Sequence, residues 1–478
     1  MYFMVRTRIA PSPTGEDIHI GNLYTALVNW VWAKKNKGKF IVRIEDTDRT
    51  RLVKDSEKKI LRTLKDFGLN YDEGPDVAGK FEPYRQSERL PLYLKFAEQL
   101  VKKKAAYYCI CSKERLDEIR LLQQKQKQIP KYDKYCWTRQ KEVNEKIKKG
   151  NPYVIRLNVP PAREIIFQDL IRGEIKVVSD NLDDQVLLKS DGFPTYHLGV
   201  VVDDYLMKIS HIIRAEEWLS STPKHILLYE AFAWEPPIFA HVPILRNPDR
   251  SKLSKRKNPV WASWYLKEGY LPEAVLNYLA LMGWSHPKQK EIFTLEELIK
   301  VFDLKDVKSV GPAFDPVKLE WMNGMYIRQT QNSKLKIQIY EFYDRKYPKE
   351  LIGKTIPLVR ERMKKLSDYL FLCEFFFKKP EKYLPAGTLA KAGDIDLSSK
   401  KELIKKIHNS LQKVTVWHAD KIGDAMQNVA TEEKVKFGEF FMILRVAITG
   451  KKISPPLNES MEILGKEECL KRLATASS

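Results

Sequence analysis

Cysteine is scarce in this sequence, and long apolar runs and a secretory leader pattern are missing from it. The five cysteines among 478 residues are Cys109, Cys111, Cys136, Cys373 and Cys469. So small and odd a number is not a disulfide framework, and it fits a reducing, cytoplasmic environment. No stretch of about 18 apolar residues is free of charge, so we expect no membrane-spanning helix. The first residues, MYFMVRTRIA, lack a signal-peptide pattern and are expected to lead directly into a strand.

Positive charge is what the chain has in excess. Lysine and arginine number 83 against 62 aspartates and glutamates, which gives a net charge of +21 and a pI of about 9.4. This balance favours a polyanionic partner, although a lysine-rich proteome would produce part of it without any function. At 478 residues the chain is too long for one core, and we expect three or more units.

The stretch from Arg6 to Asn22 suits a strand, a turn-rich loop and a helix start, in that order. Val5 to Ala10 is apolar and β-branched enough for a short buried strand, which the prolines and glycine of PSPTG then end. His19 and Gly21 precede apolar residues at helical spacing, which predicts a helix from near Asn22. Its unpaired N–H groups and positive dipole end are expected to face the loop, where anions bind. A lone histidine near a helix start is more often a capping or packing residue.

Three carboxylates follow the next predicted strand. Lys39 to Glu45, KFIVRIE, alternates and is β-branched, and it ends at Glu45, Asp46 and Asp48. In an open parallel sheet the carboxyl ends of the strands form the ligand-binding edge. The three acids are therefore a solvated turn, which is the default, a metal site, or the counter-charge of a substrate ammonium.

The segment from Tyr84 to Asp191 has the character of an insertion. Within it Cys109 and Cys111 are followed, 21 to 25 positions after Cys111, by Tyr132 and Cys136. Two thiolates on one knuckle and a later ligand pair predict a structural zinc site, with a metal-free loop as the alternative. The two remaining cysteines lie in apolar surroundings and are expected to be small buried residues.

Apolar strands return after the insertion. We predict strands at Val200 to Val202, at Ile209 to Ile213 and at Phe239 to Leu245. Arg214 and Glu217 follow the second of these, so they are expected at the edge of a sheet.

Lysines are concentrated in a short loop and in the C-terminal third. Ser251 to Lys257, SKLSKRK, is a charge run that alone indicates only a solvated face. From about Gln331 onward nearly every segment has apolar residues at helical spacing with basic residues outside. Helices with basic faces suit an RNA backbone, although most such charges are ordinary solvated ones.

Taken together, PSPTG with HIGN and the later KLSKR resemble the HIGH and KMSKS signatures of class I aminoacyl-tRNA synthetases. The strings FIVRIEDTDRTR and DDQVLLKSDGFPTYHLGVVVDDYLMKISHIIRAEEW are similar to the glutamyl branch, and the helical tail resembles its bacterial type. The resemblance implies an α/β fold, with a Rossmann-type parallel-sheet catalytic domain, an α+β insertion and an all-α C-terminal anticodon-binding region. The implied domains are residues 1–88 and 192–228 (catalytic), 89–191 (acceptor-binding insertion), 229–330 (stem contact, with the KLSKR loop) and 331–478 (anticodon-binding).

The resemblance also implies a cytoplasmic, monomeric ligase of protein synthesis that joins L-glutamate to tRNA(Glu) through a glutamyl adenylate, using ATP with Mg²⁺. The implied catalytic residues are His19, Gly21, Lys252 and Lys255, and the implied ATP contacts are His19, Gly21, Ser254 and Lys255. The implied glutamate contacts are Arg8, Ser12, Glu45, Tyr196, Arg214 and Glu217, and Val200 stands where some members have asparagine. Some members carry a zinc knuckle like Cys109, Cys111, Tyr132 and Cys136, and Arg360 and Arg362 are expected at the anticodon.

The residue types in this pocket agree with the implied substrate. Glutamate brings two carboxylates and one ammonium, which two arginines and a glutamate satisfy. Binding glutamine instead leaves an arginine unpaired, and a buried unpaired charge is costly. Two alternatives stay open: an enzyme that also charges glutamine tRNA or modifies a tRNA base, and a non-catalytic RNA-binding protein. The second predicts decay of His19, Lys252 or Lys255, and all three are present.

Overall fold

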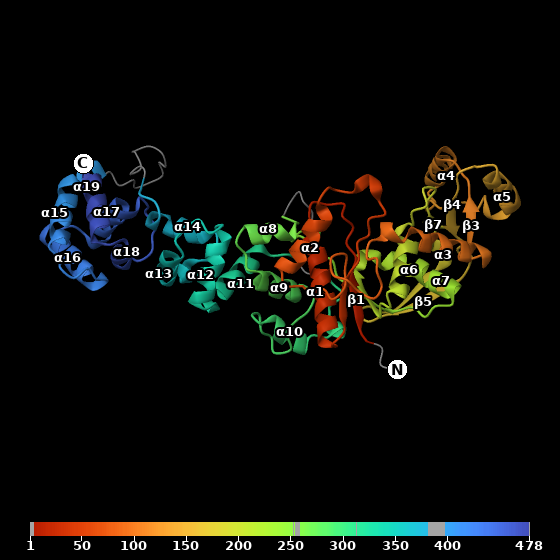
Figure 1. Ribbon diagram of the computed structural model, residues 1–478, viewed down its shortest axis with the longest axis horizontal. Helices are drawn as coiled ribbons and strands as arrows, with labels where there is room; N and C mark the ends of the chain where they lie inside the picture. The colour runs from red at the N-terminus through yellow and green to blue at the C-terminus, as the bar shows by residue number, and fades with distance from the viewer. Residues whose placement is uncertain (1–3, 252, 254–258, 312, 381–396, 478) are drawn as a thin grey trace. The chain divides into compact units, whose positions relative to one another are not determined.

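The computed structural model of the chain describes residues 4–251, 253, 259–311, 313–380 and 397–477. The chain folds into two compact units (Figure 1). The first comprises Met1–Tyr265 with Val275–Pro316, and the second Leu266–Ala274 with Val317–Ser478. The strands of the described residues lie in the first unit, and the second is helical.

The strands are short. They are β1 (Arg6–Ile9), β2 (Lys39–Val42), β3 (Ala106–Cys109), β4 (Val154–Leu157), β5 (Glu164–Asp169), β6 (Gly173–Val178), β7 (Val186–Leu188), β8 (His211–Ala215) and β9 (Ile238–Val242). The helices up to residue 329 are α1 (Ile20–Lys35), α2 (Ser56–Asp66), α3 (Leu90–Lys102), α4 (Lys113–Lys125), α5 (Gln140–Lys148), α6 (Tyr196–Leu206), α7 (Thr222–Phe232), α8 (Ala262–Lys267), α9 (Pro272–Leu281), α10 (Leu295–Val301) and α11 (Pro316–Gln329). Those that follow are α12 (Asn332–Phe342), α13 (Lys349–Val359), α14 (Asp368–Cys373), α15 (Lys401–Gln412), α16 (Ala419–Glu432), α17 (Phe437–Thr449), α18 (Leu457–Leu464) and α19 (Lys466–Ser477).

Parallel pairing places the strand ends that carry the candidate site. Strands β1 and β2 are parallel, and β8 and β9 are parallel within a four-stranded sheet of order β6-β5-β9-β8. The Ser210 N–H donates to the Arg6 carbonyl oxygen at 3.0 Å and ties β8 to β1. An antiparallel sheet of order β3-β4-β7 carries the cysteine segment. The predicted α/β class is confirmed, and the four-stranded sheet is mixed, because β5 and β6 are antiparallel.

The prediction of a strand at Val200 to Val202 is wrong. These valines lie inside α6 and are at most 1% exposed. The middle of α6, from Leu198 to Asp204, is buried, so its run of β-branched residues has the composition of a buried strand. The helix instead brings Asp203 and Asp204, its next two residues, into the interior.

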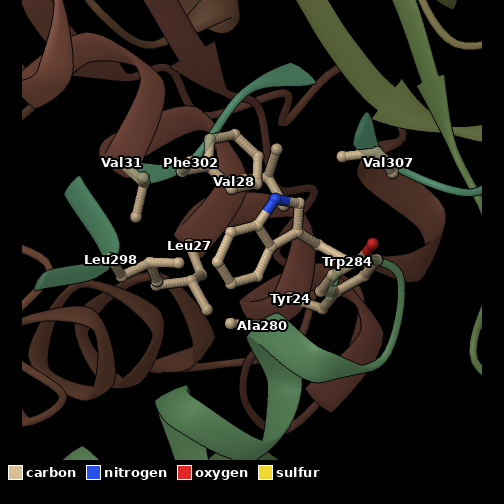
Figure 2. Close-up of a pocket in the computed structure, with 9 residues that line it drawn as sticks. All are labelled: Tyr24, Leu27, Val28, Val31, Ala280, Trp284, Leu298, Phe302 and Val307. Atoms are coloured by element: carbon tan, nitrogen blue, oxygen red, sulfur yellow. The ribbon is translucent and has the colours of Figure 1, made fainter. Parts of the chain in front are cut away.

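Helix α1 is held by tight packing rather than by one amphipathic stripe. Trp284 lies against Leu27, Val28 and Phe302, around a cavity of about 10 Å³ (Figure 2). That volume is about one water-sized probe, so this hollow is a packing gap and not a ligand site. The packing fixes α1 and thereby its first residues, next to the PSPTG loop.

The second unit is built from amphipathic helices around two apolar clusters. In α15 the buried residues are Ile404, Ile407 and Leu411, the spacing of a helix face, with charged residues between them. Such helices gain most of their stability from packing, which explains why the repeated helical spacing in the sequence identified them. Within the described residues, no helix is both long and apolar enough to cross a bilayer.

Candidate active site

His19 caps α1 at its N-terminus. Its backbone is extended, with φ −69° and ψ 143°, and its Nδ1 accepts from the Gly21 N–H at 3.0 Å. In the neutral ring the proton therefore lies on Nε2, which makes that atom a donor. A Cβ added at Gly21 would meet the His19 ring at 3.2 Å, so a larger residue here would press on the capping imidazole.

The predicted unpaired N–H groups at this helix start were a wrong expectation. The N–H groups of Ile20, Asn22 and Leu23 donate to the Val260, His19 and His19 carbonyl oxygens at 2.7, 2.8 and 2.9 Å. With the Gly21 N–H bonded to His19 Nδ1, the N–H groups of the first turn all have partners within the protein, so an anion there would interact with the dipole and the imidazole.

The histidine loop is joined to the segment that follows the lysine run. The Ala262 N–H donates to the Ile18 carbonyl oxygen at 2.9 Å, and the Ser263 N–H donates to the buried Asp17 carboxylate at 3.1 Å. The Trp261 ring lies so close to Gly15 that an added Cβ would be 2.5 Å from it. The predicted residues Lys252, Ser254 and Lys255 lie outside the described residues. Their return segment is nevertheless fixed beside His19.

A cavity of about 780 Å³ lies at the carboxyl ends of β1, β2 and β8. All six predicted glutamate contacts line it: Arg8, Ser12, Glu45, Tyr196, Arg214 and Glu217. The strand ends explain this convergence, because parallel strands deliver their C-terminal side chains to one edge.

Arg8 forms one side of the cavity and is held by a carboxylate that the sequence analysis missed. Its Nε and Nη2 donate to the two oxygens of Asp204, each at 3.1 Å. Asp204 is fully buried and also accepts from Arg43 at 2.7 Å. Because Asp204 takes one edge of the guanidinium, Nη1 is left on the other edge, 3.5 Å from the Ile213 carbonyl oxygen. Arg8 is thus fixed with donors to spare.

Glu45 is the acidic member of the same side. Its carboxylate accepts from Arg43 at 3.1 Å. Burial raises the pKa of Glu45, although the charges of Arg43 and Arg8 oppose that shift. A buried carboxylate in this position suits a cationic partner. The neighbouring acids have partners of their own: Asp46 accepts from the Ser87 N–H and hydroxyl at 2.8 and 2.5 Å, and Asp48, which also lines the cavity, accepts from Arg51 at 2.6 Å. Glu45 thus lines the cavity beside Arg43, and its role as the counter-charge of an ammonium stays a prediction.

Arg214 forms the other side and is 5% exposed. Its Nε donates to His241 Nε2 at 3.1 Å, and Nη1 donates to the Tyr196 hydroxyl at 2.8 Å and to His225 Nδ1 at 3.4 Å. Nη2 donates to the Thr222 hydroxyl at 2.8 Å and to the Trp218 carbonyl oxygen at 3.3 Å. Among the described residues, no carboxylate lies within ion-pairing distance of Arg214. Apart from Tyr196, these partners are not evident from the sequence, because they lie on other elements, among them α7 and β9.

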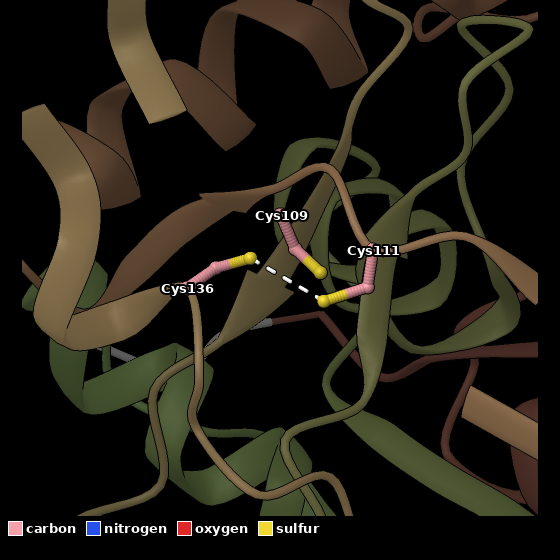
Figure 3. A group of neighbouring side chains, drawn as sticks. All are labelled: Cys109, Cys111 and Cys136. Atoms are coloured by element: carbon pink, nitrogen blue, oxygen red, sulfur yellow. Dashed lines mark hydrogen bonds between the residues drawn. The ribbon is translucent and has the colours of Figure 1, made fainter. Parts of the chain in front are cut away.

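The cysteine cluster is assembled as predicted (Figure 3). The sulfur atoms of Cys109, Cys111 and Cys136 lie within 4.8 Å of one another, and Cys111 Sγ is 3.5 Å from Cys136 Sγ. The Tyr132 hydroxyl is 3.4 Å from Cys109 Sγ and 3.2 Å from Cys111 Sγ, and it accepts the Cys136 N–H at 3.0 Å. Four donors at such spacing fit a tetrahedral zinc ion with Zn–S distances of about 2.3 Å. The cluster is largely shielded from solvent, because Cys109 and Cys136 are buried.

The predicted anticodon arginines lie in the second unit. Arg362 Nη1 donates to the Ser454 carbonyl oxygen at 2.7 Å, and Arg445 Nη1 donates to the same oxygen at 3.2 Å. Burial, and next the charge of Arg362, lowers the pKa of Arg445. Arg360 donates separately to Asn332 at 3.1 Å. Two guanidinium groups on one carbonyl form a positively charged spot suited to a phosphate or a base edge.

Comparisons with known proteins agree with these features. A family model described as the catalytic domain of class I tRNA synthetases (E and Q) matches residues 4–321, and an anticodon binding domain model matches residues 327–477. The chain therefore belongs to the class I tRNA synthetases of the glutamyl and glutaminyl type.

Similar proteins narrow this class further. A glutamate–tRNA ligase of Dehalococcoides mccartyi is 44% identical over 99% of this chain and 97% of its own length. One of Pseudoalteromonas translucida is 45% identical over 99% and 95%. A solved glutamate tRNA ligase of Elizabethkingia meningosepticum, in complex with its amino acid, has a TM-score of 0.86 at 35% identity and covers 99% of each chain. The predicted resemblance is confirmed, whereas the roles of single residues and the domain boundaries stay predictions.

Proposed function

We propose that this chain is a glutamate–tRNA ligase that activates L-glutamate with ATP and transfers it to tRNA(Glu). The observation that supports this function is the charged lining of the cavity. Arg8 and Arg214 are there for the two carboxylates of glutamate, and Glu45 is there for its ammonium group. The domains expected from the sequence divide the work into catalysis, acceptor-end binding, stem contact and anticodon reading.

The chemistry has two balanced steps. A carboxylate oxygen of glutamate attacks the α-phosphorus of ATP, the bond to the bridging oxygen breaks, and pyrophosphate leaves. A ribose hydroxyl of the tRNA terminus then attacks the acyl carbon, loses its proton, and releases AMP. Both steps depend mostly on positioning and on charge stabilisation. His19 Nε2 is the donor to phosphate oxygens in this proposal, Lys252 and Lys255 neutralise the departing pyrophosphate, and Mg²⁺ enters with ATP.

Aminoacylation with purified tRNAs tests this function. Glutamate and ATP are supplied with glutamate tRNA and with glutamine tRNA in parallel. We expect charging of glutamate tRNA alone. Charging of both tRNAs would instead support the relaxed enzyme, and charging of neither would reject the assignment. A cytoplasmic monomer remains the expectation for the protein itself.

We also propose that the cluster of Cys109, Cys111, Cys136 and Tyr132 holds a structural zinc ion. When bound, the ion would cross-link the insertion, and it would take no part in the reaction. Metal analysis of the purified protein is expected to find one zinc per chain, and Cys136→Ser to lose it. Cys469→Ser is the matched control, because Cys469 is equally buried but far from the cluster in sequence. Equal zinc content in Cys136→Ser and wild type would reject the site.

Arg360 and Arg362 are proposed anticodon contacts, with Arg445 as a third. Alanine at Arg362 is expected to raise KM for tRNA while KM for glutamate stays the same, because the cavity for glutamate lies in the first unit. Lys421→Ala, which removes an exposed charge from α16, serves as the control for general loss of positive charge. Equal effects of the two variants would contradict a specific contact.

A further inference from the structure

The two arginines of the cavity differ in their partners. Arg8 is paired with the buried carboxylate of Asp204, whereas every hydrogen-bond acceptor around Arg214 is uncharged. A buried guanidinium without a counter-ion is costly, and it is retained only where other interactions offset that cost. Arg214 therefore carries a positive charge that is available to a ligand in the cavity.

His241 is the acceptor whose state is most firmly fixed. Its Nδ1 is 2.6 Å from the Asp169 carboxylate, and both side chains are fully buried. Burial opposes the ionisation of Asp169, but hydrogen bonds from the His241 side chain and from the backbone outweigh it and lower the pKa of Asp169. The Asp169 carboxylate accepts a hydrogen bond from the N–H at Nδ1 of His241. The other nitrogen, Nε2, then carries no hydrogen and accepts from Arg214 with its lone pair.

His225 and Thr222 complete the surroundings as neutral groups. Burial, and next the charge of Arg214, keeps the pKa of His225 well below its ordinary value. His225 accepts from Arg214 on Nδ1, so its proton lies on Nε2, 3.2 Å from His197 Nδ1. Thr222, which is fully buried at the start of α7, can contribute no charge. We call Thr222, His225 and His241 the neutral shell of Arg214.

We propose that the neutral shell, with Asp169 as the residue that sets the His241 tautomer, makes Arg214 select a carboxylate over an amide in this cavity. The inference rests on the proposed function, since it concerns the choice of glutamate over glutamine. A carboxylate in the shell would pair with Arg214 and leave it equally suited to an amide. Neutral acceptors orient the guanidinium and leave its charge in place, so an amide ligand leaves that charge unpaired.

The first experiment adds a charge to the shell without changing its volume. Thr222→Asp places a carboxylate next to Arg214 Nη2, and Thr222→Asn places a neutral group of nearly the same size there. Pyrophosphate exchange with glutamate and with glutamine is measured in the presence of tRNA(Glu). We expect Thr222→Asp to lower the ratio of kcat/KM for glutamate to that for glutamine by about tenfold or more, and Thr222→Asn to keep it within about threefold.

Wild-type protein separates this inference from the function on which it rests. If wild type activates no glutamate, the proposed function fails, whatever the variants do. If wild type is active and the Asp and Asn variants show the same ratio of kcat/KM for glutamate to that for glutamine, only the proposed role of the neutral shell is rejected.

A second pair of variants tests the positioning role of His241. The amide nitrogen of asparagine can occupy the position of histidine Nδ1. His241→Asn therefore keeps a donor for Asp169 but removes the acceptor for Arg214. Glutamine reaches the Nε2 position, so His241→Gln keeps the acceptor. We expect His241→Asn to raise KM for glutamate about tenfold, His241→Gln to raise it less, and KM for ATP to stay constant in both. Equal effects on glutamate and ATP would show a merely structural role and overturn the proposal.

Discussion

The two sides of the amino-acid cavity differ in whether their buried arginines have carboxylate partners. On the β1 and β2 side, Arg8, Arg43, Glu45 and Asp204 compensate one another before any substrate arrives. On the β8 and β9 side, Arg214 is surrounded by neutral groups. In the first arrangement the loss of one partner leaves a buried charge uncompensated, and in the second a charge is kept for the ligand. The four predictions below test that difference.

The largest effect is expected from Asp204→Ala. It leaves Arg8 and Arg43 buried without the carboxylate that they share, so the free energy of unfolding should fall by about 3–5 kcal/mol. Urea unfolding measures this loss. Glu402→Ala, which breaks an exposed pair with Lys405 on α15, should leave unfolding unchanged. A loss below about 1 kcal/mol for Asp204→Ala would contradict the shared counter-ion.

Arg8→Ala is expected to affect activity more than stability. Asp204 keeps Arg43 in this variant, so unfolding changes less than in Asp204→Ala. The kcat/KM for glutamate should fall by about 100-fold or more, because a substrate carboxylate loses its charged partner. Steady-state exchange kinetics measure the fall. Arg163→Ala, outside the cavity in an exposed pair with Glu230, is the control, and unchanged glutamate turnover in Arg8→Ala would reject the contact.

Glu45→Gln should separate binding from stability. Burial raises the folded-state pKa of Glu45 above its ordinary 4.5, so the folded protein holds the proton more tightly than the unfolded chain. The contribution of Glu45 to the free energy of unfolding of the wild type therefore decreases as pH rises from about 4.5 through the raised pKa. The variant lacks this decrease. Its KM for glutamate should still rise about tenfold, because the ammonium loses a counter-charge. A steeper loss of stability with pH in the variant would contradict the assignment.

The smallest effect at neutral pH is expected from His197→Gln on the Arg214 side. Burial, with the charges of Lys224 and Arg214, lowers the pKa of His197 from 6.5 to about 3. Between those values the unfolded chain takes up a proton that the folded state does not, so wild-type stability decreases as pH falls below 6.5. The variant should remove up to about 1.4 kcal/mol per pH unit from that slope. Unfolding at pH 7.5, 6 and 5 measures it, and parallel profiles for both proteins would refute the buried neutral histidine.

Much of the candidate site could be predicted because its residues lie in contiguous strings. His19, Gly21 and Arg8 share one loop and strand, and Arg214 follows an apolar strand. Strand polarity alone then places Arg8, Glu45 and Arg214 at one sheet edge. The knuckle of Cys109 and Cys111 with the later pair of Tyr132 and Cys136 likewise predicted a cluster, and the structure brings these four side chains together.

What the sequence did not reveal are the partners that act across elements. Asp204, Asp169 and His241 lie on α6, β5 and β9, and no local period relates them to the arginines that they orient. One signal was present: Arg43 interrupts the apolar strand segment KFIVRIE, and a charge in a buried strand requires a partner. The error at Val200 to Val202 has a different origin: three consecutive buried valines show no helical period.

The shared counter-ion also has an evolutionary consequence. On the Arg214 side the acceptors are uncharged, so a single codon change at Thr222 can alter the preference of the cavity while the fold survives. On the Arg8 side Asp204 serves two arginines, and its neighbour Asp203 accepts from Gln86, Arg89 and Tyr93. A change at either aspartate must be matched at several other positions at once. New amino-acid specificities in this scaffold should therefore arise by mutation around Arg214, while the Arg8 side is inherited as a block.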